Sequence, residues 1–335
     1  MSMGKSETRK LVKWGSSKTL IMSLPRNWTK KNNLTEADEV EVCENPDGSL
    51  LVFPLRLNKE ALMEMETEIK VDQYPESIML ANIIQTKFLD GYDKINLTSK
   101  TTFTEGKVKE ISEVISDLIG FEILTRMPNE IVVKDIMALK ESSLDELVKL
   151  VSNSVVELMH NFINALTPID FPTLKAITSS KKNLFKYYLR VHRQLRKALV
   201  QPSLLTKMNI TTQDAVDFAF FIVNLNEIAT NIASMSSAVT KYQPKEVVER
   251  TLEILNPVSE KLKDAISAVL FKTTRAHTIF SEIDELRVLK RNIENDIDNV
   301  TYEEPHIESQ IILDNTEKIM DYIYSIAQTA LRRAI

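Results

Sequence analysis

The spacing of apolar and polar positions changes twice along the chain. Residues 8–54 carry short apolar runs broken by turn residues, which is typical of short strands, with one short helix expected at 25–31. The next part mixes strand-like and helix-like spacings, as expected of a small layered unit. After it, apolar side chains recur every three or four positions, which predicts long amphipathic helices. The predicted domains are residues 1–55, 56–140 and 141–335.

Six long helices are predicted in the last part. They are expected at about 144–166, 174–200, 213–240, 245–272, 276–299 and 305–333. Leu189-Arg190-Val191 recurs as Leu286-Arg287-Val288, and Ile232-Ala233 recurs as Ile326-Ala327. These offsets of 97 and 94 residues indicate two three-helix repeats, at about 141–240 and 245–335. Asn256-Pro257 is expected to kink or restart the fourth helix.

Glycine placement supports this division. All six glycines lie in the first 120 residues, and the remaining 215 residues contain none. Glycine is common in β turns and phosphate-binding loops because it adopts positive φ without steric cost. A glycine-free stretch of this length favours helices. The predicted fold class is therefore α+β and multidomain, with a β-rich head, a small α/β middle unit and an all-α C-terminal body.

Charge is also segregated along the chain. The net charge is −5, but residues 1–33 carry eight cations and one anion, a net charge of +7 that leaves −12 on residues 34–335. The cations are Lys5, Arg9, Lys10, Lys13, Lys18, Arg26, Lys30 and Lys31. A basic head on an acidic body favours binding of the head alone to an anionic polymer such as nucleic acid.

Composition argues against several classes of protein. The single Cys43 excludes an internal disulfide framework and a cysteine-rich zinc site. No apolar run approaches the roughly 18 residues of a membrane span, and the first residues lack the apolar core of a signal peptide. We therefore expect a cytoplasmic protein without membrane insertion. No P-loop, dinucleotide-binding or nucleophile-elbow motif is present, and we expect no enzymatic activity.

About 45 residues at the front carry an ordered set of motifs. They are Arg9-Lys10, Gly15-Ser16-Ser17, Ser23-Leu24-Pro25, Trp28, Leu34, Asp38-Glu39-Val40-Glu41-Val42 and Leu50-Leu51-Val52-Phe53-Pro54. This order resembles the AbrB/SpoVT/MazE family, in which two chains interlace their hairpins into one DNA-binding β-barrel. The resemblance implies a homodimer that binds DNA through Arg9, Lys10, Lys13, Lys18 and Arg26. The alternative is that these cations only solubilise a dimerisation domain.

The helical part carries two further motifs. The last helix contains Glu317-Lys318-Ile319-Met320-Asp321 followed by Ser325-Ile326-Ala327, and an earlier helix contains Arg193-Gln194-Leu195. These motifs resemble those of PhoU, a phosphate-transport regulator built from two three-helix repeats. The resemblance implies a role in phosphate uptake or homeostasis, with a phosphate-transporter ATPase or a signalling kinase as a partner.

The PhoU resemblance also implies a metal site. In that family carboxylates from neighbouring helices bind iron or zinc clusters, and residues i and i+4 share a helix face. The candidate ligands for a divalent, iron or zinc ion are Asp284, Asp314, Glu317 and Asp321. The pattern is incomplete, because Phe185, Val223 and Phe280 occupy family acidic positions. The alternative is a solvated acidic face paired with residues such as Lys318 and Arg291.

Two functions are consistent with these features. The first is a DNA-binding regulator of phosphate uptake, whose head binds DNA as a dimer and whose helical body senses a signal or docks a partner. The second is an adaptor that docks on a phosphate transporter or a signalling kinase, with the head serving only dimerisation. The middle unit carries no catalytic motif and is expected to be a structural linker.

Overall fold

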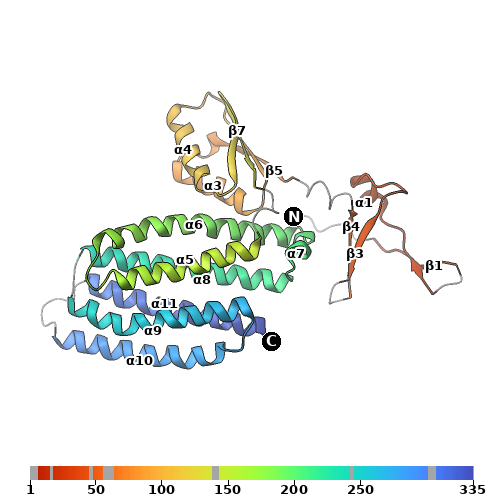
Figure 1. The fold of residues 1–335 in the computed structure, drawn as a ribbon. Coiled ribbons are helices and arrows are strands. Elements are labelled where there is room, and N and C mark those ends of the chain that lie inside the picture. Colours follow the sequence, from red (N-terminus) through yellow and green to blue (C-terminus); the bar gives the residue numbers. More distant parts are fainter. Residues whose placement is uncertain are drawn as a thin grey trace. The chain divides into compact units, whose positions relative to one another are not determined.

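A computed structural model describes residues 7–15, 18–44, 48–55, 64–137, 143–241, 245–300 and 307–334. The chain divides into two compact units, residues 1–64 and residues 65–335, which we call the head and the body unit (Figure 1). The predicted middle and helical parts thus pack together as one unit. A small sheet followed by a mostly helical body agrees with the predicted α+β class.

The head consists of two hairpins and one short helix. Strands β1 (Val12–Lys13) and β2 (Leu20–Ile21) pair antiparallel, as do β3 (Val40–Glu44) and β4 (Leu50–Pro54). Helix α1 (Arg26–Lys31) separates the two hairpins in sequence. The described residues of one chain form no closed barrel. Residues 16–17 and 45–47, which belong to two predicted turns, lie outside the described residues.

The head buries very little apolar surface by itself. Within the described residues from 7 to 55, Pro54 alone is fully buried. Leu11 and Trp14 in the first hairpin are 61% and 65% exposed, and Val42 in the second is 54% exposed. Exposed apolar side chains at this density are typical of a surface that takes part in a contact with another molecule. About 50 residues are also too few to form a large core alone.

The body unit begins with a four-stranded sheet. Its strands are β5 (Glu66–Lys70), β6 (Lys94–Thr98), β7 (Phe121–Met127) and β8 (Glu130–Asp135), in the order β5-β6-β8-β7. A short 3₁₀ turn (Val71–Gln73) and helix α3 (Ser77–Leu89) connect β5 to β6, so these two strands run parallel. Strands β7 and β8 form an antiparallel hairpin. Helices α3 and α4 (Glu105–Ser116) cover one face.

The two faces of this sheet differ because side chains alternate along each strand. The polar face carries an ion pair between Glu66 and Lys94, at 3.2 Å. The apolar face packs against the helices through Ile69, Ile95, Leu97, Ile131 and Val133, which meet Leu80, Ile84, Phe88, Ile111 and Ile115. Leu189, from the helical part of the chain, belongs to the same core. The sheet and helix α6 therefore share buried apolar contacts.

Seven helices make up the remainder of the described chain. They are α5 (Leu144–Asn164), α6 (Phe171–Val200), α7 (Ser203–Met208), α8 (Thr212–Lys241), α9 (Lys245–Phe271), α10 (Ala276–Val300) and α11 (Ile307–Ala334). The six predicted long helices are confirmed within a few residues, whereas the short α7 was not predicted. Helices α5, α6 and α8 contact one another, as do α9, α10 and α11. This arrangement confirms the predicted pair of three-helix repeats.

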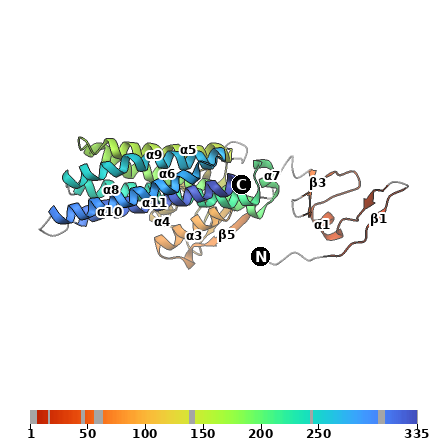
Figure 2. The same ribbon diagram turned by 90° about the horizontal axis from the view of Figure 1, so that it is seen from below.

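Helices α8 and α11 run side by side at the centre of the bundle (Figures 1 and 2). By length and composition α8 could cross a membrane, but most of its apolar stretch is buried inside the bundle. Helix α9 continues through Pro257, so of the two predicted alternatives, a kink or a restart, the restart is wrong. Leu255 and Val258, on either side of Asn256-Pro257, are fully buried. Their packing outweighs the loss of one backbone hydrogen bond.

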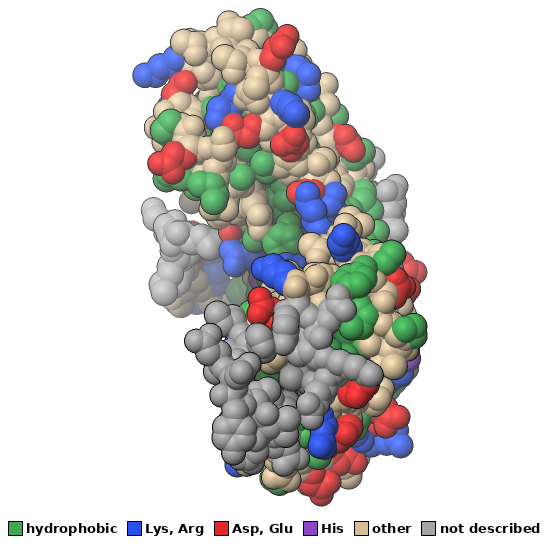
Figure 3. All heavy atoms as spheres, turned by 90° about the vertical axis from the view of Figure 1, so that its left-hand side faces the viewer, with side chains coloured by type: hydrophobic (Ala, Val, Ile, Leu, Met, Phe, Trp, Pro, Cys, Tyr) green, Lys and Arg blue, Asp and Glu red, His purple; other side chains and the backbone are tan. Residues whose placement is uncertain are grey.

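Helix α6 carries eight cations and no acid within its 30 residues. Five of them, which we call the basic stripe, recur at spacings of three or four and lie on one side of the helix. They are Lys182, Lys186, Arg190, Arg193 and Lys197. Lysine and arginine side chains gather where the α/β part meets the helices (Figure 3). Like charges at this spacing repel one another, so the stripe requires compensating groups on the α/β part.

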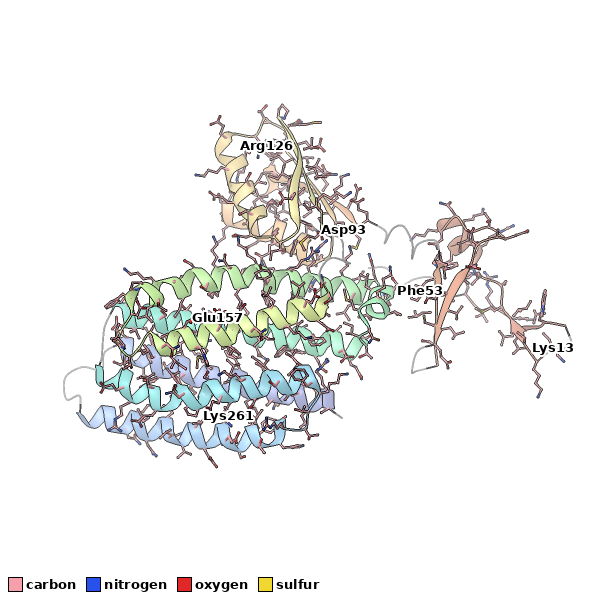
Figure 4. The ribbon with its side chains drawn as sticks, viewed as in Figure 1. Lys13, Phe53, Asp93, Arg126, Glu157 and Lys261 are labelled. Atoms are coloured by element: carbon pink, nitrogen blue, oxygen red, sulfur yellow. The ribbon has the colours of Figure 1, made fainter. Side chains whose placement is uncertain are left out.

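Arg193 lies at the centre of these compensating contacts. Its guanidinium, only 2% exposed, donates to Asp135 at 3.1 Å and to Asp93 at 3.0 Å. It also donates to the backbone carbonyl of Phe88 at 2.6 Å. The rings of Phe88 and Phe121 lie 5.0 and 5.1 Å from it. Asp93 lies on the side of the α/β part that faces α6 (Figure 4).

The basic stripe also caps the C-terminal ends of both helices that cover the sheet. Arg193 contacts the last turn of α3 through the Phe88 carbonyl. Lys186 donates to the carbonyl of Ser116, the last residue of α4, at 3.1 Å. Carbonyl groups at a helix C-terminus have no partner within the helix and carry partial negative charge. One helix thus supplies hydrogen-bond donors and positive charge to two helix ends.

Two glycines allow α6 to approach this closely. Gly91 and Gly120 follow α3 and α4, and both adopt a φ of +90°. A Cβ atom on Gly120 would lie 2.8 Å from a carboxylate oxygen of Asp135, and one on Gly91 would lie 3.1 Å from the Cβ of Lys197. Any other residue would strain the backbone and displace the groups that bind the basic stripe.

We expect Arg193→Met to destabilise the body unit by about 3 kcal/mol, because it leaves Asp93 and Asp135 buried with fewer positive partners. The matched control is Arg196→Met, one residue before Lys197, because Arg196 is half exposed and its pair with Asp90 contributes less than about 1 kcal/mol. Urea denaturation followed by circular dichroism measures both. Equal losses from the two variants would contradict this account of the interface.

Candidate nucleic-acid interface and the acidic surface of the body

The five predicted DNA-binding residues lie on the first hairpin and at the start of α1. Arg9 and Lys10 precede β1, Lys13 lies within it, Lys18 precedes β2, and Arg26 is the first residue of α1. All five are exposed. Arg9 contacts Glu7, the single anion among the first 33 residues. The head therefore exposes these positive charges to solvent on the first hairpin and on α1, which follow one another in the sequence.

The geometry of the first hairpin places its cations at the tip and along one strand. Lys13 lies opposite Leu20 in the β1–β2 register, and the Trp14 amide donates to the Thr19 carbonyl at 3.0 Å. Gly15 adopts a φ of +59° at the start of the turn, a conformation that glycine adopts without strain. A lysine in such a hairpin neutralises phosphate as a point charge, and an arginine can bind it with two parallel hydrogen bonds.

The acidic residues predicted as metal ligands lie on α10 and α11, and Arg287 joins two of them. Its guanidinium donates to Asp284 at 2.8 Å, on its own helix, and to Asp321 at 2.6 Å on α11. The ring of Tyr324 lies 5.4 Å from the same guanidinium. One arginine thus bridges the two carboxylates across the helix pair.

Lys290, one turn further along α10, makes the second bridge. Its Nζ atom lies 2.5 Å from Glu317 on α11 and 2.7 Å from Glu294 on α10, and its side chain is only 5% exposed. Burial disfavours the charged ammonium group, but the hydrogen bonds to Glu294 and Glu317 outweigh this effect and raise the pKa of Lys290. The same hydrogen bond from Lys290 lowers the pKa of Glu317.

The observed arrangement does not fit a metal cluster. Arg287 and Lys290 lie between the carboxylates, and Asp314 accepts a hydrogen bond from Gln310 at 2.8 Å. Within the described ranges, no three His, Cys, Asp or Glu side chains gather as a candidate metal site. We therefore derive no chemistry through a metal. The predicted alternative, a paired acidic face, describes the contacts better: Lys290 and Arg287 make the ion pairs, and Arg291 adds to the positive charge that lowers the pKa of Glu317.

A sequence signal for these cations was available. Arg287 follows Asp284 by three residues and Lys290 precedes Glu294 by four, which places each pair on one helix face. Arg287 was noticed only as part of the internal repeat. The spacing does not reveal the partners on α11, Asp321 and Glu317, because contacts between α10 and α11 depend on how the two helices pack.

Comparisons with known proteins find both predicted parts. Residues 11–60 match a family model described as "Antidote-toxin recognition MazE, bacterial antitoxin". A solved structure, the phosphate transport system regulatory protein PhoU from Streptococcus pneumoniae, is similar at 14% sequence identity with a TM-score of 0.48. That similarity covers 57% of this chain and 92% of the PhoU chain. No curated protein matches the chain. A MazE-like head and a PhoU structural neighbour are the two resemblances that the sequence predicted.

Glu317→Gln should reduce thermal stability at neutral pH, because the lowered pKa of Glu317 means that its ionised form stabilises the fold. This stabilisation is present above the ordinary glutamate pKa of about 4.3 and is lost as the pH falls through the lower folded value. The melting temperatures of the two proteins should therefore converge in acid. Scanning fluorimetry between pH 7 and pH 3 measures the difference, and a constant difference would contradict the assignment.

Proposed function

We propose that the protein is a cytoplasmic, DNA-binding regulator of phosphate uptake that acts as a dimer. The observation that supports DNA binding most directly is the MazE-like head with its exposed basic hairpin. The link to phosphate rests on the PhoU-like motifs of the sequence and on the two three-helix repeats. No enzymatic step is part of the proposal.

Charge determines which part of the molecule meets DNA. Residues 1–33 carry +7 and the remainder carries −12, so the body repels a nucleic acid that the head attracts. A dimer doubles the number of cations that face the phosphates. Release of counterions from DNA then makes the affinity steeply dependent on salt. The body would contribute regulation, through a signal or a protein partner, rather than DNA contacts.

The proposed dimer accounts for the missing core of the head. Leu11, Trp14 and Leu20 are each more than half exposed in the single chain. If a second copy contributes its own hairpins, the same apolar side chains become buried between the two chains. The cations then remain on the outside, since lysine and arginine are rarely buried without partners.

A second candidate function keeps the dimer and omits the DNA. In this alternative the head only joins two chains, and the helical body docks on a phosphate transporter or a signalling kinase. Val216 and Phe220 favour it, because they are large apolar residues one turn apart on α8 and are 41% and 58% exposed. Exposed pairs of this kind are common at protein–protein contacts. DNA binding by the full chain distinguishes the two functions.

In a gel-shift assay at low salt, we expect the full chain to bind duplex DNA. Neutralising Arg9, Lys10 and Arg26 together should weaken binding by about 100-fold, because up to six phosphate contacts are lost per dimer. The slope of log affinity against log salt should fall by about 0.9 for each lost contact.

The matched control neutralises three exposed lysines of the body, Lys109, Lys149 and Lys318. This change removes the same charge but should leave the affinity for DNA unchanged or slightly weaker. An equal loss in both triple variants would mean that net charge alone governs binding. Absence of binding by the unaltered chain at low salt would favour the adaptor function.

Light scattering on the full chain should give a particle of twice the 38.3 kDa chain mass. Introducing a charge at Leu20, as Leu20→Asp, should shift the population to single chains, because the apolar surface that the partner covers is interrupted. Leu124→Asp is the control, since Leu124 is equally exposed at 54% but lies on the sheet of the body unit. A monomeric full chain at micromolar concentration would contradict the dimer.

A further inference from the structure

The acidic surface between α10 and α11 contains four carboxylates and two buried or half-buried cations. Asp284 and Asp321 meet at Arg287, and Glu294 and Glu317 meet at Lys290. Each cation takes one carboxylate from its own helix and one from α11. The two bridges lie one helical turn apart, and each joins α10 to α11 through one cation between two carboxylates.

The Lys290 Nζ atom lies where a bound cation would lie, whereas Arg287 reaches its two carboxylates through two different nitrogens. The Lys290 Nζ atom is 2.5 and 2.7 Å from oxygens of two carboxylates that belong to different helices. Protein carboxylates bind hard divalent cations at about 2.0–2.6 Å, so a metal ion placed there would find the same oxygens nearly within reach. The ammonium group supplies the positive charge at that point and its aliphatic chain fills the space.

From this geometry we infer that Lys290 and Arg287 are resident cations that replace a divalent metal between α10 and α11. The second repeat is thus held together without a metal. A lysine carries a fixed single charge at neutral pH, so the bridge forms regardless of how much metal is available. The inference does not depend on whether the head binds DNA.

The inference predicts that removing the lysine creates a metal site. In Lys290→Ala, the Glu294 and Glu317 carboxylates face each other without a cation, and the lost side chain leaves space between them. We expect a melting temperature lower by roughly 5 °C, and recovery of at least half of that loss with 1 mM Mn²⁺. Mn²⁺ is the probe because it prefers carboxylate oxygens. The full-length protein without added metal should melt at the same temperature with and without EDTA.

Lys318→Ala is the control, because it removes an exposed lysine next to Glu317 and should respond to Mn²⁺ no more than the unaltered protein does. If Lys290→Ala fails to fold, Arg287→Ala tests the neighbouring pair, Asp284 and Asp321, in the same way. Two results would overturn the inference. One is a stoichiometric metal in the purified unaltered protein that Glu317→Gln removes. The other is a Lys290 or Arg287 variant that folds but gains no stability from Mn²⁺.

Discussion

The buried contact of Arg193 with Asp93 and Asp135 determines how the body unit is assembled. A guanidinium group loses several kcal/mol of hydration when it is buried, and only several well-placed acceptors compensate for that loss. Arg193 finds them in two carboxylates and a helix-terminal carbonyl of the α/β part. Because these acceptors come from the last turn of α3, the segment before β6 and the end of β8, they lie close together only when α3 and the sheet are folded and packed against α6. The small α/β part is therefore integral to the body rather than a linker between two separate domains.

Arginines at equivalent positions of the two repeats form ion pairs with different parts of the chain. Arg190 on α6 and Arg287 on α10 lie 97 residues apart within matching fragments. Arg190 is fully buried and donates to Asp135 at 2.7 Å, across to the α/β part. Arg287 stays partly exposed and joins Asp284 to Asp321 within the second repeat. In the first repeat, Arg190 thus pairs with a carboxylate of the α/β part. In the second repeat, Arg287 pairs with carboxylates of the same repeat. Both repeats are stabilised by fixed side-chain charges.

The head and the body unit differ in how much apolar surface each of them buries. The body unit has a core between the sheet and its helices that reaches α6, and buried apolar side chains along the long helices. The head has two short hairpins and one fully buried residue in the part that the structure describes. In the proposed dimer a second chain covers this exposed apolar surface, and joining two heads also brings their cations together. In the proposed dimer, stability and DNA binding of the head both depend on association, whereas the body unit buries its apolar surface within one chain.

The sequence by itself determined the order of the β-rich head, the small α/β part and the six long helices, but not the short α7. The 3–4 spacing of apolar residues located six long helices, and the Gly15 turn with its flanking strands indicated a MazE-like hairpin. These features could be predicted because they depend on neighbours within a few residues. Only the tertiary structure decided which charged side chains pair with one another. Arg193 was noticed only as part of a PhoU-like motif, and the candidate metal ligands Glu317 and Asp321 were assigned without Lys290 and Arg287. Their partners lie on other helices or about 60 to 100 residues away. Ion pairs between distant segments depend on helix packing and on burial, and no local spacing encodes either.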